Sequence, residues 1–312
     1  MAGDANYASV SLLLHGDGVN NATTFPDNSF APKTVTPAGN AKVSTTQSKF
    51  GGASIYLDGA GDYLTVGSPS DWTSMHTSSA KWTVEMWIKP DNWTSGKTLF
   101  STSNGSTGNS GLYCAIDAST RTINLEIYRA VASSFVINGS FSGVIPNDTN
   151  QHHIAITYDY SLGSANATLW IDGVASGTLS KTGNAPSAAA ATAALKIGGF
   201  STTGDYAGYI DDFRITDGII RYSGTFTPHT IAHPNGAATV GGVIRDDTGA
   251  VCSRVVRIMR RDTGAVLGTI SSDSGTGAYE FSVPTTDEVD VIVHDDAAGT
   301  VYNDLILRVI PA

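Results

Sequence analysis

Residues 82–89 read Trp82-Thr-Val-Glu-Met-Trp-Ile-Lys89 and alternate between two kinds of side chain. The residues at 82, 84, 86 and 88 are all apolar, whereas those at 83, 85, 87 and 89 comprise three polar residues and one tryptophan. Because successive side chains of a strand point to opposite faces, this period of two predicts a strand with one face in a core. Residues 167–171 alternate in the same way, with Trp170 opposite the apolar set, and run into the hairpin signal Asp172-Gly173.

Similar short runs recur along the whole chain, and clusters of Gly, Asn, Asp and Ser separate them. This spacing is typical of a sandwich or barrel. The 312 residues include 24 aspartates but only four glutamates, and aspartate favours turns where glutamate favours helices. The sequence therefore predicts an all-β protein with many turns.

The composition changes near residue 235. All five tryptophans precede it, and His233-Pro-Asn-Gly236 reads as a linker because Pro and Asn-Gly interrupt regular structure. About seven short strands follow, with a turn every 8–12 residues, which is the spacing of an immunoglobulin-like sandwich. We expect one domain over residues 1–234 and a smaller sandwich over residues 235–312.

Charge and composition disfavour several classes of protein. A formal net charge of −10 provides no basic surface for nucleic acid or anionic membranes. No run of 18 apolar residues exists, so membrane insertion is not expected, and the first residues lack the features of a signal peptide. The only cysteines, Cys114 and Cys252, lie 138 positions apart, which favours two unpaired thiols made in a reducing cytoplasm.

The first domain resembles the laminin-G-like, or concanavalin A-like, jelly roll in the variant common among bacteriophage structural proteins. The resemblance covers about 220 residues and rests on the order of several motifs rather than on any one of them. These motifs include Leu12-Leu-Leu-His-Gly-Asp17, Phe50-Gly-Gly-Ala-Ser-Ile-Tyr-Leu-Asp-Gly59, Gly208-Tyr-Ile-Asp-Asp-Phe-Arg-Ile215 and the closing Arg221-Tyr-Ser-Gly-Thr-Phe-Thr-Pro228.

The second domain resembles the carboxypeptidase-regulatory or transthyretin-like sandwich over about 75 residues. The similarity lies in Val240-Gly-Gly-Val-Ile244, the Asp-Thr-Gly turns and Gly277-Ala-Tyr279. The pairing of the two domains implies a virion protein that assembles in the host cytoplasm. The resemblance also implies other virion proteins as partners, and virion symmetry favours a homo-oligomer within the particle.

No catalytic site is expected. Glucanases with a related jelly roll carry a Glu-x-Asp-x-x-Glu strand, and retaining enzymes need two carboxylates about 5–5.5 Å apart. None of the four glutamates has such neighbours, and Glu85 is interpreted as a solvated or salt-bridged strand residue. His152 and His153 are adjacent on a strand and face opposite sides, so they cannot share one metal ion.

Two kinds of binding site remain open. The resemblance implies a structural calcium ion at strand ends, and the candidate ligands are Asp17, Asp58, Asp62, Asp211 and Asp212. Calcium prefers six to eight oxygen ligands. For each aspartate taken alone a structural role is favoured over a calcium ligand, and for Asp58 and Asp62 that role is to cap the Asp-Gly-Ala-Gly-Asp turn.

Aromatic platforms beside polar groups point to glycans. Alternation places Trp87 and Trp170 away from the core. They would either form an outer groove that binds the glycan or be covered by loops or by a neighbouring subunit. Trp72 and Trp93 lie in polar segments, and we expect them to face solvent and contact the glycan from there. We therefore expect a non-enzymatic phage virion protein of the tail or its fibres, whose jelly roll recognises a host surface glycan and whose small domain provides attachment. The alternatives are a capsid decoration protein, a lectin or a glycan hydrolase.

Overall fold

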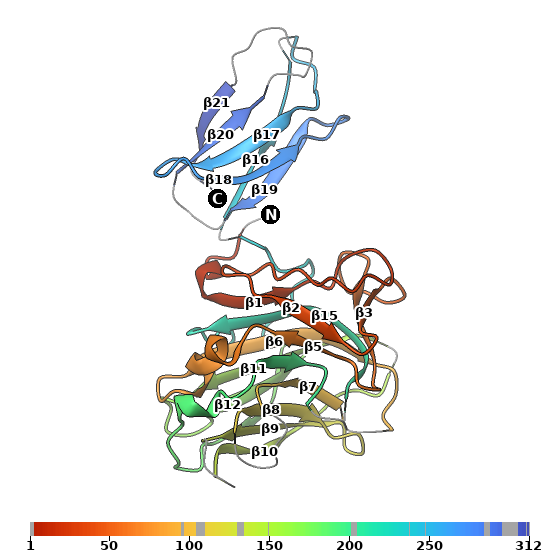
Figure 1. The fold of residues 1–312 in the computed structure, drawn as a ribbon, viewed down its shortest axis with the longest axis vertical. Coiled ribbons are helices and arrows are strands. Elements are labelled where there is room, and N and C mark those ends of the chain that lie inside the picture. The colour runs from red at the N-terminus through yellow and green to blue at the C-terminus, as the bar shows by residue number, and fades with distance from the viewer. Residues whose placement is uncertain are drawn as a thin grey trace. The chain divides into compact units, whose positions relative to one another are not determined.

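A computed structural model describes the chain except for residues 1–2, 95–96, 104–109, 130–133, 149, 201–204, 237, 247, 284–287, 295–304, 310 and 312 (Figure 1). Contacts divide the protein into two compact units, Ser9–His233 and Met1–Ala8 together with Pro234–Ala312. The larger unit is a two-sheet sandwich, and the prediction of an all-β protein is confirmed. No helix among the described residues is long and apolar enough to span a membrane.

The first sheet of the larger unit is antiparallel and comprises eight of the described strands. In spatial order they are β13 (Val174–Leu179), β12 (Ala167–Ile171), β11 (His152–Asp159), β6 (Lys81–Pro90), β15 (Ala207–Asp217), β4 (Ser54–Asp58) and β3 (Lys42–Ser44), and β1 (Val10–Leu14) also pairs with β15. Consecutive neighbours in space are often distant in sequence, as in a jelly roll.

The second sheet comprises seven described strands, also antiparallel. In spatial order they are β10 (Phe135–Val144), β9 (Thr122–Tyr128), β8 (Leu112–Ile116), β7 (Lys97–Ser101), β14 (Leu195–Ile197), β5 (Tyr63–Val66) and β2 (Val35–Ala38). Short 3₁₀ helices occur at η1 (Tyr7–Ser9), η2 (Pro69–His76) and η3 (Ala188–Ala190).

The hydrophobic core lies between the two sheets. The apolar residues of β6 face it, since Trp82, Val84, Met86 and Ile88 are each at most 1% exposed. Leu169 of β12 and Ile154 and Ile156 of β11 join the same cluster. The period-two prediction for residues 82–89 and 167–171 therefore placed the core face correctly.

The opposite face of the first sheet is also covered at its centre. Every residue of β11 is buried, and so are Thr83, Glu85 and Trp87 on the outer side of β6. The cover is residues 218–233, called the strap below, which follow β15. The Thr83 hydroxyl donates to the carbonyl of Ile219 (2.9 Å) and accepts from the amide of Arg221 (3.0 Å). Farther along, the amide of Phe226 donates to the carbonyl of Gly173 (3.0 Å).

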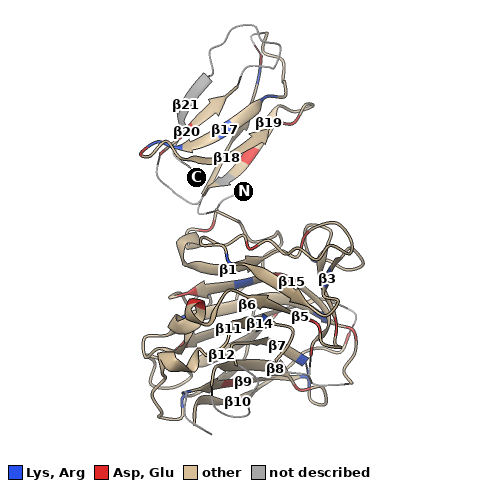
Figure 2. Cartoon of the chain, viewed as in Figure 1, with Lys and Arg blue, Asp and Glu red and all other residues tan. Residues whose placement is uncertain are grey.

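The smaller unit contains two described sheets around a valine-rich core. One pairs β16 (Ala238–Val243) with β19 (Ala278–Val283), and the other has the order β18 (Val266–Ser271), β17 (Val255–Arg260), β20 (Val289–Val293) and β21 (Leu305–Val309). Val240, Val256, Ile258 and Val291 are each at most 1% exposed. In Figure 2 the described Lys and Arg residues are scattered over different strands and loops.

Candidate functional site

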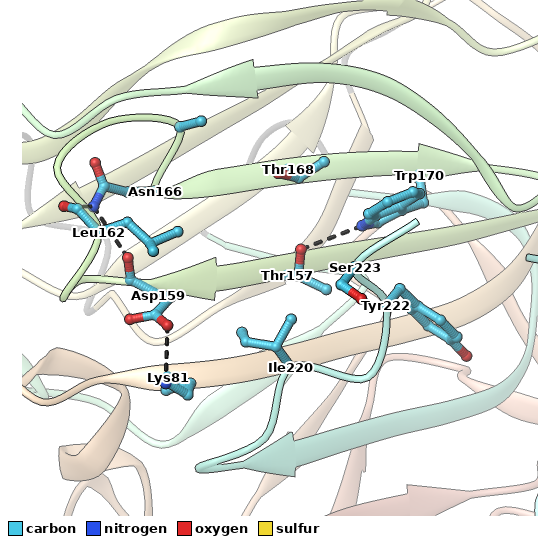
Figure 3. Close-up of a pocket in the computed structure, with 11 residues that line it drawn as sticks. Lys81, Thr157, Asp159, Leu162, Asn166, Thr168, Trp170, Ile220, Tyr222 and Ser223 are labelled. Atoms are coloured by element: carbon cyan, nitrogen blue, oxygen red, sulfur yellow. Dashed lines mark hydrogen bonds and ion pairs between the residues drawn. The ribbon is translucent and has the colours of Figure 1, made fainter. Parts of the chain in front are cut away.

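An open pocket of about 520 Å³ lies on the outer face of the first sheet (Figure 3). Strands β6, β11 and β12 form its floor, and the strap contributes Ile220, Tyr222 and Ser223. The remaining lining residues are Lys81, Thr157, Asp159, Leu162, Ala165, Asn166, Thr168 and Trp170. The pocket therefore exists because the strap covers only part of a polar sheet face.

Aromatic rings form one side of the pocket. Trp170 is 4% exposed, and its Nε1 donates to the hydroxyl of Thr157 (3.2 Å), which fixes the plane of the indole. Tyr222 and Phe226 of the strap stack on each other at 3.6 Å and 7°. Their ring centroids lie 6.5 Å and 5.8 Å from that of Trp170. Trp170 is thus a buried support of the pocket, whereas Tyr222 is half-buried and has one ring face stacked on Phe226.

The other side of the pocket is polar. Lys81 Nζ lies 2.9 Å from Asp159 Oδ2, and the side-chain amide of Asn166 donates to the Asp159 carbonyl (3.0 Å). Burial opposes ionisation of Asp159, but hydrogen bonds from Ser161 and Lys81 outweigh it and hold the pKa of this carboxyl below its usual value. The pocket therefore presents one anionic and one cationic group, fixed in place, beside aromatic surface.

A buried ion-pair network lies beneath the strap next to the pocket. Glu85 is fully buried, and its Oε1 accepts from Nε (3.0 Å) and Nη2 (2.6 Å) of Arg214. Its Oε2 accepts from the Tyr222 hydroxyl (2.5 Å). Burial raises the pKa of Glu85, but the Arg214 charge and nearby histidines more than compensate, so the pKa lies well below its usual value. Glu85 is thus a salt-bridged residue, one of the two interpretations of the sequence, and it is not solvated.

Trp87 is covered by the strap and by the loop around Phe50. Its Nε1 donates to Nε2 of His229 (3.1 Å), and Lys49 Nζ lies 3.7 Å from the centre of its ring. Trp87 is 5% exposed and is not among the residues that line the pocket. Trp87 and Trp170 do share the outer face, as expected, but the structure does not bring them together in one groove.

The expectation that Trp72 faces solvent is wrong. Trp72 lies in η2, is 1% exposed and donates from Nε1 to the Val66 carbonyl (3.1 Å). Pro69 begins this 3₁₀ helix, and its three-residue period turns Trp72 and Met75 to the same buried side. Trp93 is half-buried and packs against the core cluster, away from the pocket-lining residues.

Asp58 and Asp62 accept hydrogen bonds from their own turn and from Asn40. Asp62 accepts from the amides of Asp58 (2.9 Å) and Asn40 (2.7 Å), one on each carboxylate oxygen. Asp58 accepts from the amide of Ala60 (2.8 Å) and the side-chain amide of Asn40 (3.0 Å). Each of the four oxygens has a partner, and two of these contacts cap the Asp58–Asp62 turn, which is the alternative that the sequence left open.

The other three candidate calcium ligands lie near one another, at the ends of β1 and in β15. Asp212 has Oδ1 2.7 Å from His15 Nδ1 and Oδ2 2.9 Å from His229 Nε2. Asp211 is 1% exposed, and its Oδ2 accepts from the amides of Lys49 (2.5 Å) and Phe50 (3.2 Å), but its Oδ1 has no hydrogen-bond partner. Burial, together with the nearby Asp212 and Asp17 charges, raises the pKa of Asp211 to about 7.

Comparisons with known proteins place the larger unit in a family. The model of the concanavalin A-like lectin/glucanases superfamily matches residues 58–221. No curated protein sequence matches the chain. Among solved structures, a domain of an extracellular arabinanase from Geobacillus stearothermophilus, in complex with arabinotriose, is 16% identical (TM-score 0.42; 67% of this chain and 92% of that one).

Two further solved structures have comparable similarity. The CBM40 domain of a Ruminococcus gnavus sialidase, bound to α2,6 sialyllactose, is 12% identical (TM-score 0.43; 55% and 92%). The binding domain of botulinum neurotoxin DC, in complex with rat synaptotagmin II, is 14% identical (TM-score 0.45; 93% and 72%). The family model alone spans more than half of the 312 residues, so this chain belongs to the concanavalin A-like lectin/glucanases superfamily.

Proposed function

We propose that the jelly roll binds a glycan in the pocket between β6, β11, β12 and the strap. The observation that carries this proposal is the combination of Tyr222 and Trp170 with the Lys81–Asp159 pair around one opening. Sugars present apolar ring faces and a rim of hydroxyl groups, so aromatic surface beside fixed donors and acceptors suits them. The volume of about 520 Å³ lies within the usual range for small-ligand sites, about 300–1,000 Å³.

The pocket supports binding without cleavage. Asp159 is the only carboxylate among the described residues that line the pocket, and glycoside hydrolysis generally needs two carboxylates across the scissile bond. Glu85 is close by, but both of its oxygens are engaged by Arg214 and Tyr222. Of the other glutamates, Glu126 accepts from the Tyr128 hydroxyl (2.7 Å) on the second sheet. We therefore propose a recognition module rather than an enzyme.

Blocking the pocket should abolish binding. Thr168 lines the pocket at mid-strand, so Thr168→Arg places a long side chain into it. We expect the affinity for any glycan identified on a glycan array to fall at least about tenfold, or about 1.4 kcal/mol, in calorimetric titration. Thr65→Arg is the matched control, because Thr65 is a half-buried mid-strand threonine on the second sheet. Equal binding by both variants would place the glycan elsewhere.

We further propose that the protein is a phage virion component of the tail or its fibres. The support is that the segment Arg221–Pro228 and the order of the two units resemble those of phage structural proteins. The smaller, transthyretin-like unit would attach the protein, as a homo-oligomer, to other virion proteins. Immunogold electron microscopy of the particle, with an antibody to each unit, tests this role. Label at the tail or fibres is expected; label spread over the capsid would indicate a decoration protein, and unlabelled particles would contradict a virion role.

We also propose a structural calcium ion near Asp17 and Asp211. The support is the buried Asp211 Oδ1, which lacks a partner, and the adjacent exposed carboxylate of Asp17. These two residues would hold the ion, and their hard oxygens suit it. Asp58, Asp62 and Asp212 are less suited to the role, because each of their oxygens already has a hydrogen-bond or ion-pair partner.

Calcium should therefore stabilise the protein through Asp211. At a calcium concentration about 100-fold above Kd, the free energy of unfolding should rise by about 2.7 kcal/mol, because only the folded state binds the ion. Asp211→Asn should remove this gain, whereas Asp58→Asn should preserve it. Thermal unfolding with calcium and with chelator measures the effect. A gain that persists in Asp211→Asn would rule out this site.

A further inference from the structure

A group of potential metal ligands lies beneath the strap, and neither the glycan pocket nor the calcium proposal uses it. Glu85 of β6 and His229 and His233 of the strap each offer one ligand atom, and these atoms all lie within 4.8 Å of one another. Glu85 and His233 are buried, whereas His229 is half-buried and gives the group an approach from solvent. The three residues come from segments about 140 positions apart.

The distances from the His233 ring to the nearby carboxylates are long for hydrogen bonds. Nε2 of His233 lies 3.5 Å from Glu85 Oε2 and 3.8 Å from Asp212 Oδ2, and it has no hydrogen-bond partner. Good hydrogen bonds of this type are about 2.7–3.2 Å long. By contrast, bonds of about 2.0–2.1 Å from zinc to nitrogen or oxygen put tetrahedral ligand atoms about 3.3–3.4 Å apart. The separation of His233 and Glu85 is close to that value.

His229 also has a ring nitrogen without a hydrogen-bond partner. Its Nε2 contacts both Trp87 Nε1 and Asp212 Oδ2, although one ring nitrogen cannot accept from the first and donate to the second at once. Its Nδ1 is buried and has no hydrogen-bond partner. A carboxylate that holds a histidine ring in place, as Asp212 does here, is a common companion of metal-binding histidines.

The local charge favours a cation. Arg214 donates to Oε1 of Glu85, whereas Oε2 accepts from the Tyr222 hydroxyl and lies 3.3 Å from His153 Nε2 and 3.5 Å from His233 Nε2. A carboxylate oxygen has two lone pairs, so Oε2 can bind a metal ion besides accepting from Tyr222. Two carboxylates, those of Glu85 and Asp212, therefore lie against the histidines, and Arg214 is ion-paired with the first of them.

We propose that Glu85, His229 and His233 form a binding site for Zn²⁺ or a similar transition-metal ion, which fastens the strap to the first sheet. Imidazole and carboxylate are the ligands that zinc takes beside thiolate. The Tyr222 hydroxyl donates to the same Glu85 oxygen, and the Tyr222 side chain lines the pocket. The metal would therefore also hold the strap wall of the pocket in position.

Cobalt absorption tests the site directly. Untagged full-length protein carrying Cys252→Ser, which removes the half-buried thiol, is titrated with Co²⁺ in the presence of calcium. We expect one equivalent to bind with the intense visible bands of four- or five-coordinate Co²⁺ and to be displaced by Zn²⁺. His229→Gln and His233→Gln should each weaken Co²⁺ affinity at least about tenfold, since even loss of an outer-shell partner costs about 10–100-fold.

His152→Gln provides the matched control. His152 contacts Asp148 and Asp172, outside this group, so its loss should leave the cobalt spectrum and affinity unchanged. Circular dichroism in chelator verifies that each variant is folded, and the half-buried His229 is the safer substitution if His233→Gln unfolds. The proposal is overturned if the parent protein gives only weak octahedral bands, or if His229→Gln binds Co²⁺ as tightly as His152→Gln does.

Discussion

Glu85→Ala is expected to lower the free energy of unfolding of the larger unit by about 3–5 kcal/mol, because it leaves the Arg214 guanidinium buried without its counter-ion. Glu85 is 0% exposed and Arg214 5% exposed, so solvent provides little compensation. The Tyr222 hydroxyl also loses its acceptor, which weakens the attachment of the strap. Chemical denaturation measures the change.

Two comparisons show whether the ion pair is the cause. Glu126→Ala removes a half-buried glutamate from β9 and should cost much less. Adding Arg214→Met to Glu85→Met should recover part of the loss, because apolar replacement of both partners removes the uncompensated charge. A double variant less stable than either single variant would contradict this explanation.

Trp72→Ala is expected to cost about 3–5 kcal/mol of unfolding free energy, the usual range for truncating a fully buried aromatic side chain. The side chain is among the largest that are fully buried, and its loss also leaves the Val66 carbonyl without the Nε1 donor. The measurement is again chemical denaturation, with Trp93→Ala as the control. Trp93 is only half-buried, so the same substitution should cost clearly less. If both substitutions lowered the free energy of unfolding equally, the burial of Trp72 would not be what stabilises the core.

The core face of the first sheet could be predicted from the sequence because the alternation in residues 82–89 is a local signal. Side-chain direction in a strand depends only on position along it, so Trp82 and Trp170 could be assigned to opposite faces without knowing the fold. Trp72 was misplaced for a local reason as well. Its Ser- and Thr-rich neighbours resemble a loop, whereas Pro69 followed by Trp72 and Met75 at a spacing of three was the signal for a buried 3₁₀ helix.

The candidate sites depend on contacts that no local pattern encodes. Glu85 meets Arg214 because β6 pairs with β15, strands that lie about 130 positions apart, and meets Tyr222 and His233 because the strap returns over that sheet. Alternation placed Trp87 and Trp170 on the same face, but the path of the strap decides that Trp170, and not Trp87, lines the pocket described above. The sequence offered only two separate signs of this buried ion pair, namely Glu85 in one strand and Arg214 in another.

The aspartates illustrate the same limit. Asp58 and Asp62 flank a glycine-rich turn, and their turn contacts follow from that local sequence. The exposed Asp17 and buried Asp211 lie almost two hundred positions apart, and Asp211 is buried because the loop at Lys49 and Phe50 folds over it. Its unpartnered oxygen could therefore be recognised only in three dimensions.

A glycan is proposed to bind beside Trp170, and the indole N–H resonances of the tryptophans report directly on this claim. The five tryptophans give five indole signals in an ¹H–¹⁵N spectrum, and Trp170→Phe assigns the one at the pocket. On titration with the best glycan from an array, we predict that the Trp170 signal shifts most, and that the signals of the core residues Trp72 and Trp82 stay in place. A shift confined to Trp87 or Trp93, or glycan binding that leaves the Trp170 signal unmoved, would contradict the claim.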